Sequence, residues 1–135
     1  MKILIAEDDL ASRMILQRFL EDYGDVDVTV NGEEAVDVFM RALDENQPYD
    51  IICLDILMPE MNGMKVLEKI RNKEKSMGIS SDKKVKLIVT TSLDAPRSFP
   101  DNEDTAVKGT ENYLTKPIDL QKLSVILEKY GFSKE

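Results

Sequence analysis

Histidine and tryptophan are absent from this chain of 135 residues, and cysteine occurs once, at Cys53. Without histidine, the chain has no Ser-His-Asp or Cys-His nucleophile arrangement, and a zinc site is disfavoured. A single cysteine forms no internal disulfide, and Cys53 stands in an apolar run, where it is expected to be a small buried residue. Any metal must therefore be bound mainly through oxygen ligands.

Long apolar stretches are also missing, so the sequence predicts no membrane-spanning helix. The N-terminal "MKILIAEDD" reaches acidic residues after a few apolar ones, which is unlike a signal peptide or an anchor. Lys and Arg total 18 against 26 for Asp and Glu, a net charge of −8 that argues against direct nucleic-acid binding. We expect a cytoplasmic protein.

The length allows one domain with a substantial core, and 42% of the residues are hydrophobic. We expect a single domain over 1–135, with its core at about 2–131 and no output domain. Short apolar runs predict strands at 2–6, 25–30, 51–54, 85–90 and 112–115. Helical spacing predicts helices within 10–24, within 31–43, after Asn62 and within 119–131. This alternation predicts an α/β fold whose parallel sheet is covered on both faces.

Two segments depart from this regular alternation of strands and helices. Val26, Val28 and Val30 alternate with polar residues, as in a half-exposed edge strand. The stretch 92–109 contains Pro96 and Pro100, so that a helix there is expected to be short and within 101–108.

Polar residues follow the apolar runs at the positions where parallel strands place their carboxyl ends. They are Glu7, Asp8 and Asp9 after the first run, Asp55 after the third, Thr90, Thr91 and Ser92 after the fourth, and Lys116 with Pro117 after the fifth. A carboxylate that ends a buried strand is costly to desolvate unless its charge is compensated. Asp55 therefore requires an explanation.

If the first and third strands are neighbours, several carboxylates meet in one crevice, and either one pKa rises or a cation binds. Oxygen ligands without histidine favour Mg²⁺. Lys116 and the Thr91 hydroxyl would reach an anion beside that metal. A carboxylate nucleophile, Mg²⁺, a lysine and a hydroxyl are the groups needed for phosphoryl transfer onto Asp55. Simpler interpretations remain: Asp9 is expected to cap a helix, and an aromatic residue such as Tyr113 is often packed core.

The segments "ILIAEDD", "LDILMPEMNG", "IVTTS" and "YLTKP" occur in this order, and over about 2–131 the chain resembles a receiver domain of bacterial two-component response regulators. The resemblance, to single-domain chemotaxis-type regulators, implies a doubly wound five-stranded sheet of flavodoxin-like order 2-1-3-4-5. It implies Mg²⁺ bound by Asp8, Asp55 and the backbone carbonyl of Leu57, with Glu7 acting through water.

The resemblance also implies functional roles. Asp55 becomes the phosphoacceptor, Lys116 the phosphate-binding lysine, Thr91 the switch hydroxyl and Tyr113 the switch aromatic, with a cis Lys116–Pro117 bond. Thr90 and Thr91 both suit the hydroxyl role, and Thr91 is preferred because the small Ser92 follows it.

The implied function is a phosphorylation switch without separate substrate turnover. A sensor histidine kinase or a histidine phosphotransfer protein would donate the phosphoryl group, and an unidentified downstream protein would bind the result. Alternatives are a non-phosphorylated scaffold or a Mg²⁺-dependent phosphohydrolase, which requires an aspartate where this chain has Leu57. A flavodoxin-like electron carrier is disfavoured because no Ser/Thr/Gly-rich loop follows the first strand.

Overall fold

The computed structural model describes residues 1–56, 63–91 and 113–134. Within them, a five-stranded sheet has the order β2-β1-β3-β4-β5, and every neighbouring pair is parallel. The strands are β1 (Lys2–Ala6), β2 (Asp25–Thr29), β3 (Ile51–Asp55), β4 (Lys86–Thr91) and β5 (Tyr113–Thr115). The sheet order and the α/β class agree with the sequence prediction.

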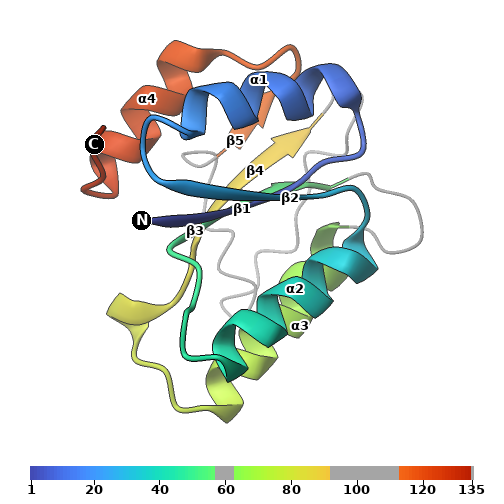
Figure 1. The fold of residues 1–135 in the computed structure, drawn as a ribbon, viewed down its shortest axis with the longest axis vertical. Helices are drawn as coiled ribbons and strands as arrows, with labels where there is room; N and C mark the ends of the chain where they lie inside the picture. The colour runs from blue at the N-terminus through green and yellow to red at the C-terminus, as the bar shows by residue number, and fades with distance from the viewer. Residues whose placement is uncertain (57–62, 92–112, 135) are drawn as a thin grey trace.

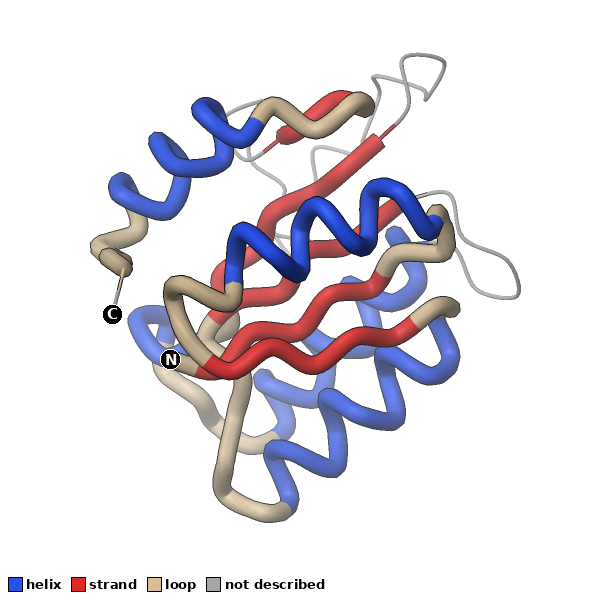
Figure 2. The backbone as a smooth tube through the Cα atoms, turned by 45° about the horizontal axis from the view of Figure 1, so that its top comes forward, coloured by secondary structure: helices blue, strands red, loops and turns tan. Residues whose placement is uncertain are grey.

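Helices cover both faces of the sheet (Figures 1 and 2). α1 (Leu10–Leu20) and α4 (Leu120–Lys129) lie on one face, and α2 (Gly32–Asp44) and α3 (Gly63–Ser76) lie on the other. A short 3-10 helix, η1 (Ser81–Lys83), precedes β4. Because β3 is central, all five of its residues are buried, as its continuous apolar run predicts.

Two apolar clusters form the core, one on each face of the sheet. Leu4, Ile52 and Leu87 belong to the cluster that includes residues of α2 and α3, whereas Ile5, Cys53 and Ile88 belong to the cluster that includes residues of α1 and α4. This alternation follows from the period of two in a strand. Cys53 is 1% exposed, and burial raises the pKa of its thiol to about 12, which confirms the small buried residue expected.

β2 is an edge strand, as its alternating pattern predicted, but it ends at Thr29, and Val30 is 41% exposed. Asp25 and Asp27 are exposed, and Val26 and Val28 are half-buried. Thr29, in contrast, is buried, and its Oγ1 donates a hydrogen bond to the Ile5 carbonyl at 2.9 Å. The edge strand is thereby joined to β1 by a side chain as well as by the backbone ladder.

The helices begin at capping residues. Asp9 accepts a hydrogen bond from the backbone N–H of Ser12 at the start of α1, and Asp119 accepts from that of Gln121 at the start of α4. The Asp9 cap agrees with the sequence prediction. Asn31 caps α2 by accepting a hydrogen bond from the backbone N–H of Glu34.

The apolar residues of α1 are not all buried. Ile15 is adjacent to Leu16 in the helical spacing but is 40% exposed, because the buried stripe of α1 is narrow and centred on Leu16 and Leu20. The expected helix within 101–108 and the expected cap at Asn62 lie outside the described residues. No helix in the described parts of the chain is long and apolar enough to cross a membrane.

Candidate functional site

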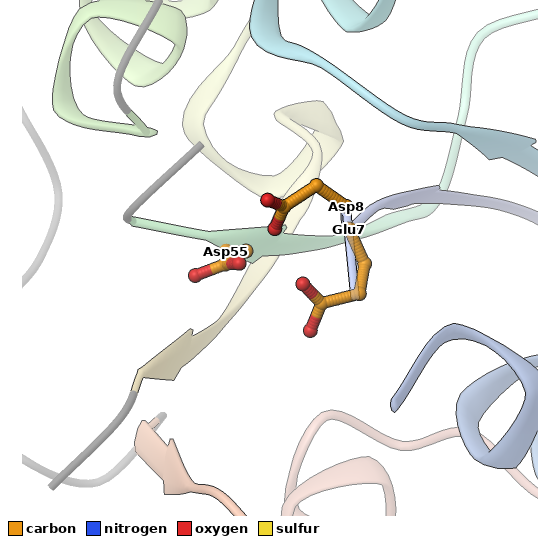
Figure 3. Close-up of side chains that lie close together, drawn as sticks. All are labelled: Glu7, Asp8 and Asp55. Atoms are coloured by element: carbon orange, nitrogen blue, oxygen red, sulfur yellow. The ribbon is translucent and has the colours of Figure 1, made fainter. Parts of the chain in front are cut away.

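The sheet register brings the polar ends of three strands together. Ala6 of β1 lies opposite Leu54 of β3, so Glu7 and Asp55 follow as neighbours, and Asp55 lies opposite Thr90 of β4. Glu7, Asp8 and Asp55 each offer one carboxylate oxygen, and these oxygens lie within 4.8 Å of one another. Figure 3 shows the three carboxylates grouped around a common space.

The burial of the three carboxylates is unequal. Glu7 is 0% and Asp55 2% exposed, whereas Asp8 is exposed at the solvent side of the group. We call this group of three carboxylates, with Glu7 and Asp55 buried and Asp8 exposed, the acidic crevice. The expectation that the acidic residues after β1 converge with Asp55 is correct in its geometry.

Lys116 supplies the positive charge of this crevice. Its Nζ lies 2.7 Å from Glu7 Oε1, 2.9 Å from Glu7 Oε2 and 3.1 Å from Asp55 Oδ2. The lysine directly follows β5, and its backbone N–H donates to the Thr91 carbonyl at 2.8 Å. The Lys116–Pro117 peptide bond is cis, as the resemblance implied.

The crowding of charge appears in the pKa values. Burial, followed by the hydrogen bond with Asp55, raises the pKa of Glu7 from 4.5 to about 8, although Lys116 opposes the shift. Burial and the same neighbour also raise the pKa of Asp8. Burial alone would lower the pKa of Lys116, but its bonds to Glu7 and Asp55 outweigh this and raise it. Clustered carboxylates are expected either to raise one pKa or to bind a cation, and the raised pKa of Glu7 agrees with the first of these consequences.

The donor set suits a hard divalent cation. When all three carboxyl groups are ionised, they and the one ammonium group carry a net charge of −2, which Mg²⁺ would balance, and all the carboxylate donors are oxygens. Because Asp8 is exposed, a cation could reach the three carboxylates from solvent. Leu57, whose carbonyl was expected to be a further ligand, lies outside the described residues.

The two threonines at the end of β4 are both buried, at 1% and 4% exposure for Thr90 and Thr91. Alternation along β4 places Thr90 on the Ile88 face, toward α1 and α4, and Thr91 on the Val89 face, toward α2 and α3. Among the described residues, Thr90 Oγ1 has no hydrogen-bond partner. Tyr113 pairs with Val89 through the backbone, and its side chain is outside the described part.

Two residues near the crevice were not singled out from the sequence as site residues. Arg13 reaches back from α1, and its Nη1 lies 3.3 Å from the Glu7 carbonyl oxygen and 3.5 Å from that of Asp8. Gly63 begins α3 against β3, where an added Cβ would stand 2.6 Å from the Asp55 carbonyl oxygen. Only their positions in the sequence could have indicated them. Arg13 stands one turn into the helix that follows the acidic pair, and Gly63 stands at the end of the segment that follows Asp55.

Comparison with known proteins gives a consistent result. The family model of the response regulator receiver domain matches residues 3–128. The transcriptional regulatory protein CiaR of Streptococcus pneumoniae is 36% identical over 94% of this chain, and the chain spans 50% of CiaR's length. The two-component response regulator ORR41 of rice (Oryza sativa subsp. japonica) is 30% identical, with 96% of this chain and 93% of ORR41 covered.

A solved structure also matches. The receiver domain of Ssk1 from Saccharomyces cerevisiae, crystallised with the histidine phosphotransfer protein Ypd1, superposes with a TM-score of 0.68 and 30% identity. The match covers 95% of this chain and 87% of that one. Sequence, sheet order and site geometry therefore agree: the chain belongs to the response regulator receiver domain family.

Proposed function

We propose that this chain accepts a phosphoryl group from a partner's phosphohistidine onto Asp55 and signals by a changed affinity for a downstream protein. The observation that carries the proposal is the Lys116 ammonium, held between Glu7 and Asp55 in an acidic crevice at the strand ends. A lysine that contacts a buried aspartate can stabilise an anionic group that arrives at that carboxylate.

In the proposed transfer, a carboxylate oxygen of Asp55 attacks phosphorus, and the bond from phosphorus to the imidazole nitrogen breaks. The Lys116 ammonium group would shift part of its ionic contact from Asp55 to the arriving phosphoryl oxygens. We assign Asp8, Asp55 and the Leu57 carbonyl as direct Mg²⁺ ligands and Glu7 as a ligand through water. Bound Mg²⁺ would neutralise charge on the phosphoryl oxygens.

The phosphohistidine that donates the group lies outside these 135 residues, which contain no histidine. A sensor histidine kinase or a histidine phosphotransfer protein is the proposed donor, in line with the Ssk1 receiver crystallised with Ypd1. We expect the exchange to occur in the cytoplasm, with no direct nucleic-acid contact. The chain would assist its own phosphorylation and dephosphorylation without a separate substrate.

The proposed switch passes through Thr91 and Tyr113. The new phosphate would draw the buried Thr91 hydroxyl inward, and Tyr113 would fill the space that it leaves. Variant Tyr113→Ala is expected to accept the phosphoryl group but to lose the change in partner affinity. Normal signalling by this variant would exclude the aromatic step.

The direct test is intact mass after incubation with acetyl phosphate, with and without Mg²⁺, on the wild type and on Asp55→Asn. We expect one phosphoryl adduct that requires both Mg²⁺ and Asp55. The exposed Asp50, just before β3, supplies the matched control Asp50→Asn, which should still be phosphorylated. No adduct under any condition would favour the scaffold alternative.

A further inference from the structure

The acidic crevice depends on a short loop that carries two of its three carboxylates. Glu7 and Asp8 lie between β1 and α1, and α1 begins only two residues later, at Leu10. Rotation of a single peptide unit in this loop would turn a carboxylate away from Asp55. The crevice therefore requires something that fixes the backbone at Glu7 and Asp8.

Two contacts within the loop supply part of this constraint. The Asp9 carboxylate caps α1 through the Ser12 N–H at 3.0 Å, and the Asp9 N–H approaches Glu7 Oε2 at 3.4 Å. The second contact holds the Glu7 carboxylate, and the Glu7 N–H in addition donates to the Thr29 carbonyl at 3.1 Å. These contacts leave the carbonyl groups of Glu7 and Asp8, which determine the orientation of those peptide units, to be held by another group.

Arg13 contacts both of these carbonyl groups. Its backbone N–H makes the first hydrogen bond of α1, to the Asp9 carbonyl at 2.9 Å, and long side chains in a helix lean toward its N-terminus. The guanidinium is thereby directed back over the loop, with Nη1 3.3 Å from the Glu7 oxygen and 3.5 Å from the Asp8 oxygen. A guanidinium carries several donors in one plane, so it can hold two neighbouring carbonyl groups at once.

We propose that Arg13 is a positioning residue of the acidic crevice: by bridging the Glu7 and Asp8 carbonyls, it holds their carboxylates in the geometry that binds Mg²⁺. This inference rests on the proposed Mg²⁺ site and adds a residue to it. Arg13 contacts neither the carboxylate group of Glu7 nor that of Asp8 in the described hydrogen bonds and ion pairs, so its effect passes through the backbone.

The experiment measures Mg²⁺ affinity by titration calorimetry with MgCl₂ on the wild type and on the variants Arg13→Gln and Arg13→Lys. Groups that orient metal ligands typically change affinity by about tenfold or more, so Arg13→Gln should bind Mg²⁺ about tenfold more weakly. Arg13→Lys keeps the charge, but its side chain is more flexible and lacks the planar guanidinium, so its Mg²⁺ affinity should be intermediate. Full recovery in Arg13→Lys would show that the fixed geometry of the guanidinium is not required and would overturn the positioning role.

Arg18→Gln is the matched control, because Arg18 lies on the same helix, is exposed and carries the same charge. It should bind Mg²⁺ like the wild type, and equal affinity in Arg13→Gln and Arg18→Gln would overturn the proposal. Thermal unfolding separates a purely structural role. If Arg13 only stabilises α1, Arg13→Gln will lower the melting temperature equally with and without Mg²⁺; we expect instead a smaller Mg²⁺-induced increase. A wild type without Mg²⁺ binding would contradict the proposed function itself, whereas failure confined to the variants would contradict this inference alone.

Discussion

Within the crevice, folding changes the protonation of Glu7 most clearly. It is fully buried, and its pKa of about 8 contrasts with 4.5 for an ordinary glutamate. In the metal-free protein, folded Glu7 keeps its proton up to about pH 8, while unfolded Glu7 loses it near pH 4.5. Between these values the folded state binds more protons, so a rise in pH favours the unfolded state.

We therefore expect the free energy of unfolding in EDTA to fall as pH rises from about 4.5 to about 8. The expected loss is about 2 kcal/mol, below what the whole shift would give because the crevice is open to solvent beside Asp8. Urea unfolding at several pH values measures it. Glu7→Gln removes the titrating group and should flatten the profile across this window. The same slope in both proteins would assign the pH dependence to other groups.

Thr90 offers a second test at the residue scale. Its hydroxyl is buried and has no hydrogen-bond partner among the described residues, an arrangement that costs free energy without a compensating bond. Thr90→Val keeps the shape of the side chain and removes the hydroxyl. We expect the free energy of unfolding to stay equal or to rise by about 1 kcal/mol. Thr91→Val is the comparison, because Thr91 has an interaction partner and should not gain stability.

At the scale of elements, the start of α3 packs directly against the end of β3. Gly63 donates its N–H to the Ile56 carbonyl at 2.8 Å, and a Cβ there would stand 2.6 Å from the Asp55 carbonyl oxygen and 2.7 Å from Ile56 Cα. These are backbone atoms and cannot move aside independently. The close approach of α3 thus depends on glycine at this position.

Gly63→Ala should force α3 away from the end of β3 and displace Asp55. We expect a loss of about 2 kcal/mol in the free energy of unfolding, typical of overpacking, and slower phosphorylation by acetyl phosphate. Denaturant unfolding and the rate of adduct formation in intact mass measure the two effects. Ser76→Ala, at the exposed other end of α3, controls for alanine in the same helix. Wild-type phosphorylation in Gly63→Ala would show that Asp55 does not depend on this contact.

The opposite end of α3 is fixed to β4 by a buried ion pair. Glu74, 1% exposed, accepts from Arg71 Nη1 at 2.6 Å and from the Val85 N–H at 2.8 Å, while Arg71 Nη2 donates to the Val85 carbonyl at 3.0 Å. Both backbone groups of Val85 are thus held by α3. Val85 lies just before β4, away from the strand ends that form the crevice.

Glu74→Ala would leave the Arg71 guanidinium and the Val85 N–H buried without their acceptor. We expect the free energy of unfolding to fall by about 3 kcal/mol, because the remaining charge has lost its partner. Exposed Glu68 on the same helix provides the control Glu68→Ala, which should change stability little. The folded fraction of Glu74→Ala should still be phosphorylated at Asp55. A loss below about 1 kcal/mol would show that solvent reaches and satisfies these groups.

The elements were predictable because their signals are local. The apolar run of β3, the alternation in β2 and the caps Asp9 and Asp119 depend on neighbouring residues, and all four are present. The convergence of acidic residues with Asp55 followed from the rule that parallel strands end at one edge of a sheet. Contacts between distant segments were not predictable in this way. The charged stretch "RNKEK" at 71–75 by itself indicates a solvated helix face, yet it contains Arg71 and the buried Glu74, because only the tertiary fold brings Val85 against α3.

For the molecule as a whole, the charge is distributed unevenly. Residues 21–50, which include β2 and α2, contain ten acidic residues and one basic residue, Arg41. The crevice adds three carboxylates at the ends of β1 and β3. With a net charge of −8, repulsion among these groups opposes the compact state. Salt should therefore stabilise the metal-free protein by screening, by about 1 kcal/mol between low and high ionic strength.

Mg²⁺ should do more than screen, because the Mg²⁺ site proposed in the crevice would bind it specifically. At equal ionic strength, MgCl₂ should raise the free energy of unfolding above the value in NaCl, by about 2.7 kcal/mol when the free ion is at a hundred times its dissociation constant. Asp8→Asn removes the exposed carboxylate of the crevice and should abolish this excess while keeping the response to NaCl. Asp37→Asn, an exposed carboxylate in α2, should retain both responses. Urea unfolding in the two salts measures the difference. An equal excess in Asp8→Asn and in the wild type would locate the Mg²⁺ site elsewhere, because general screening does not distinguish one surface carboxylate from another.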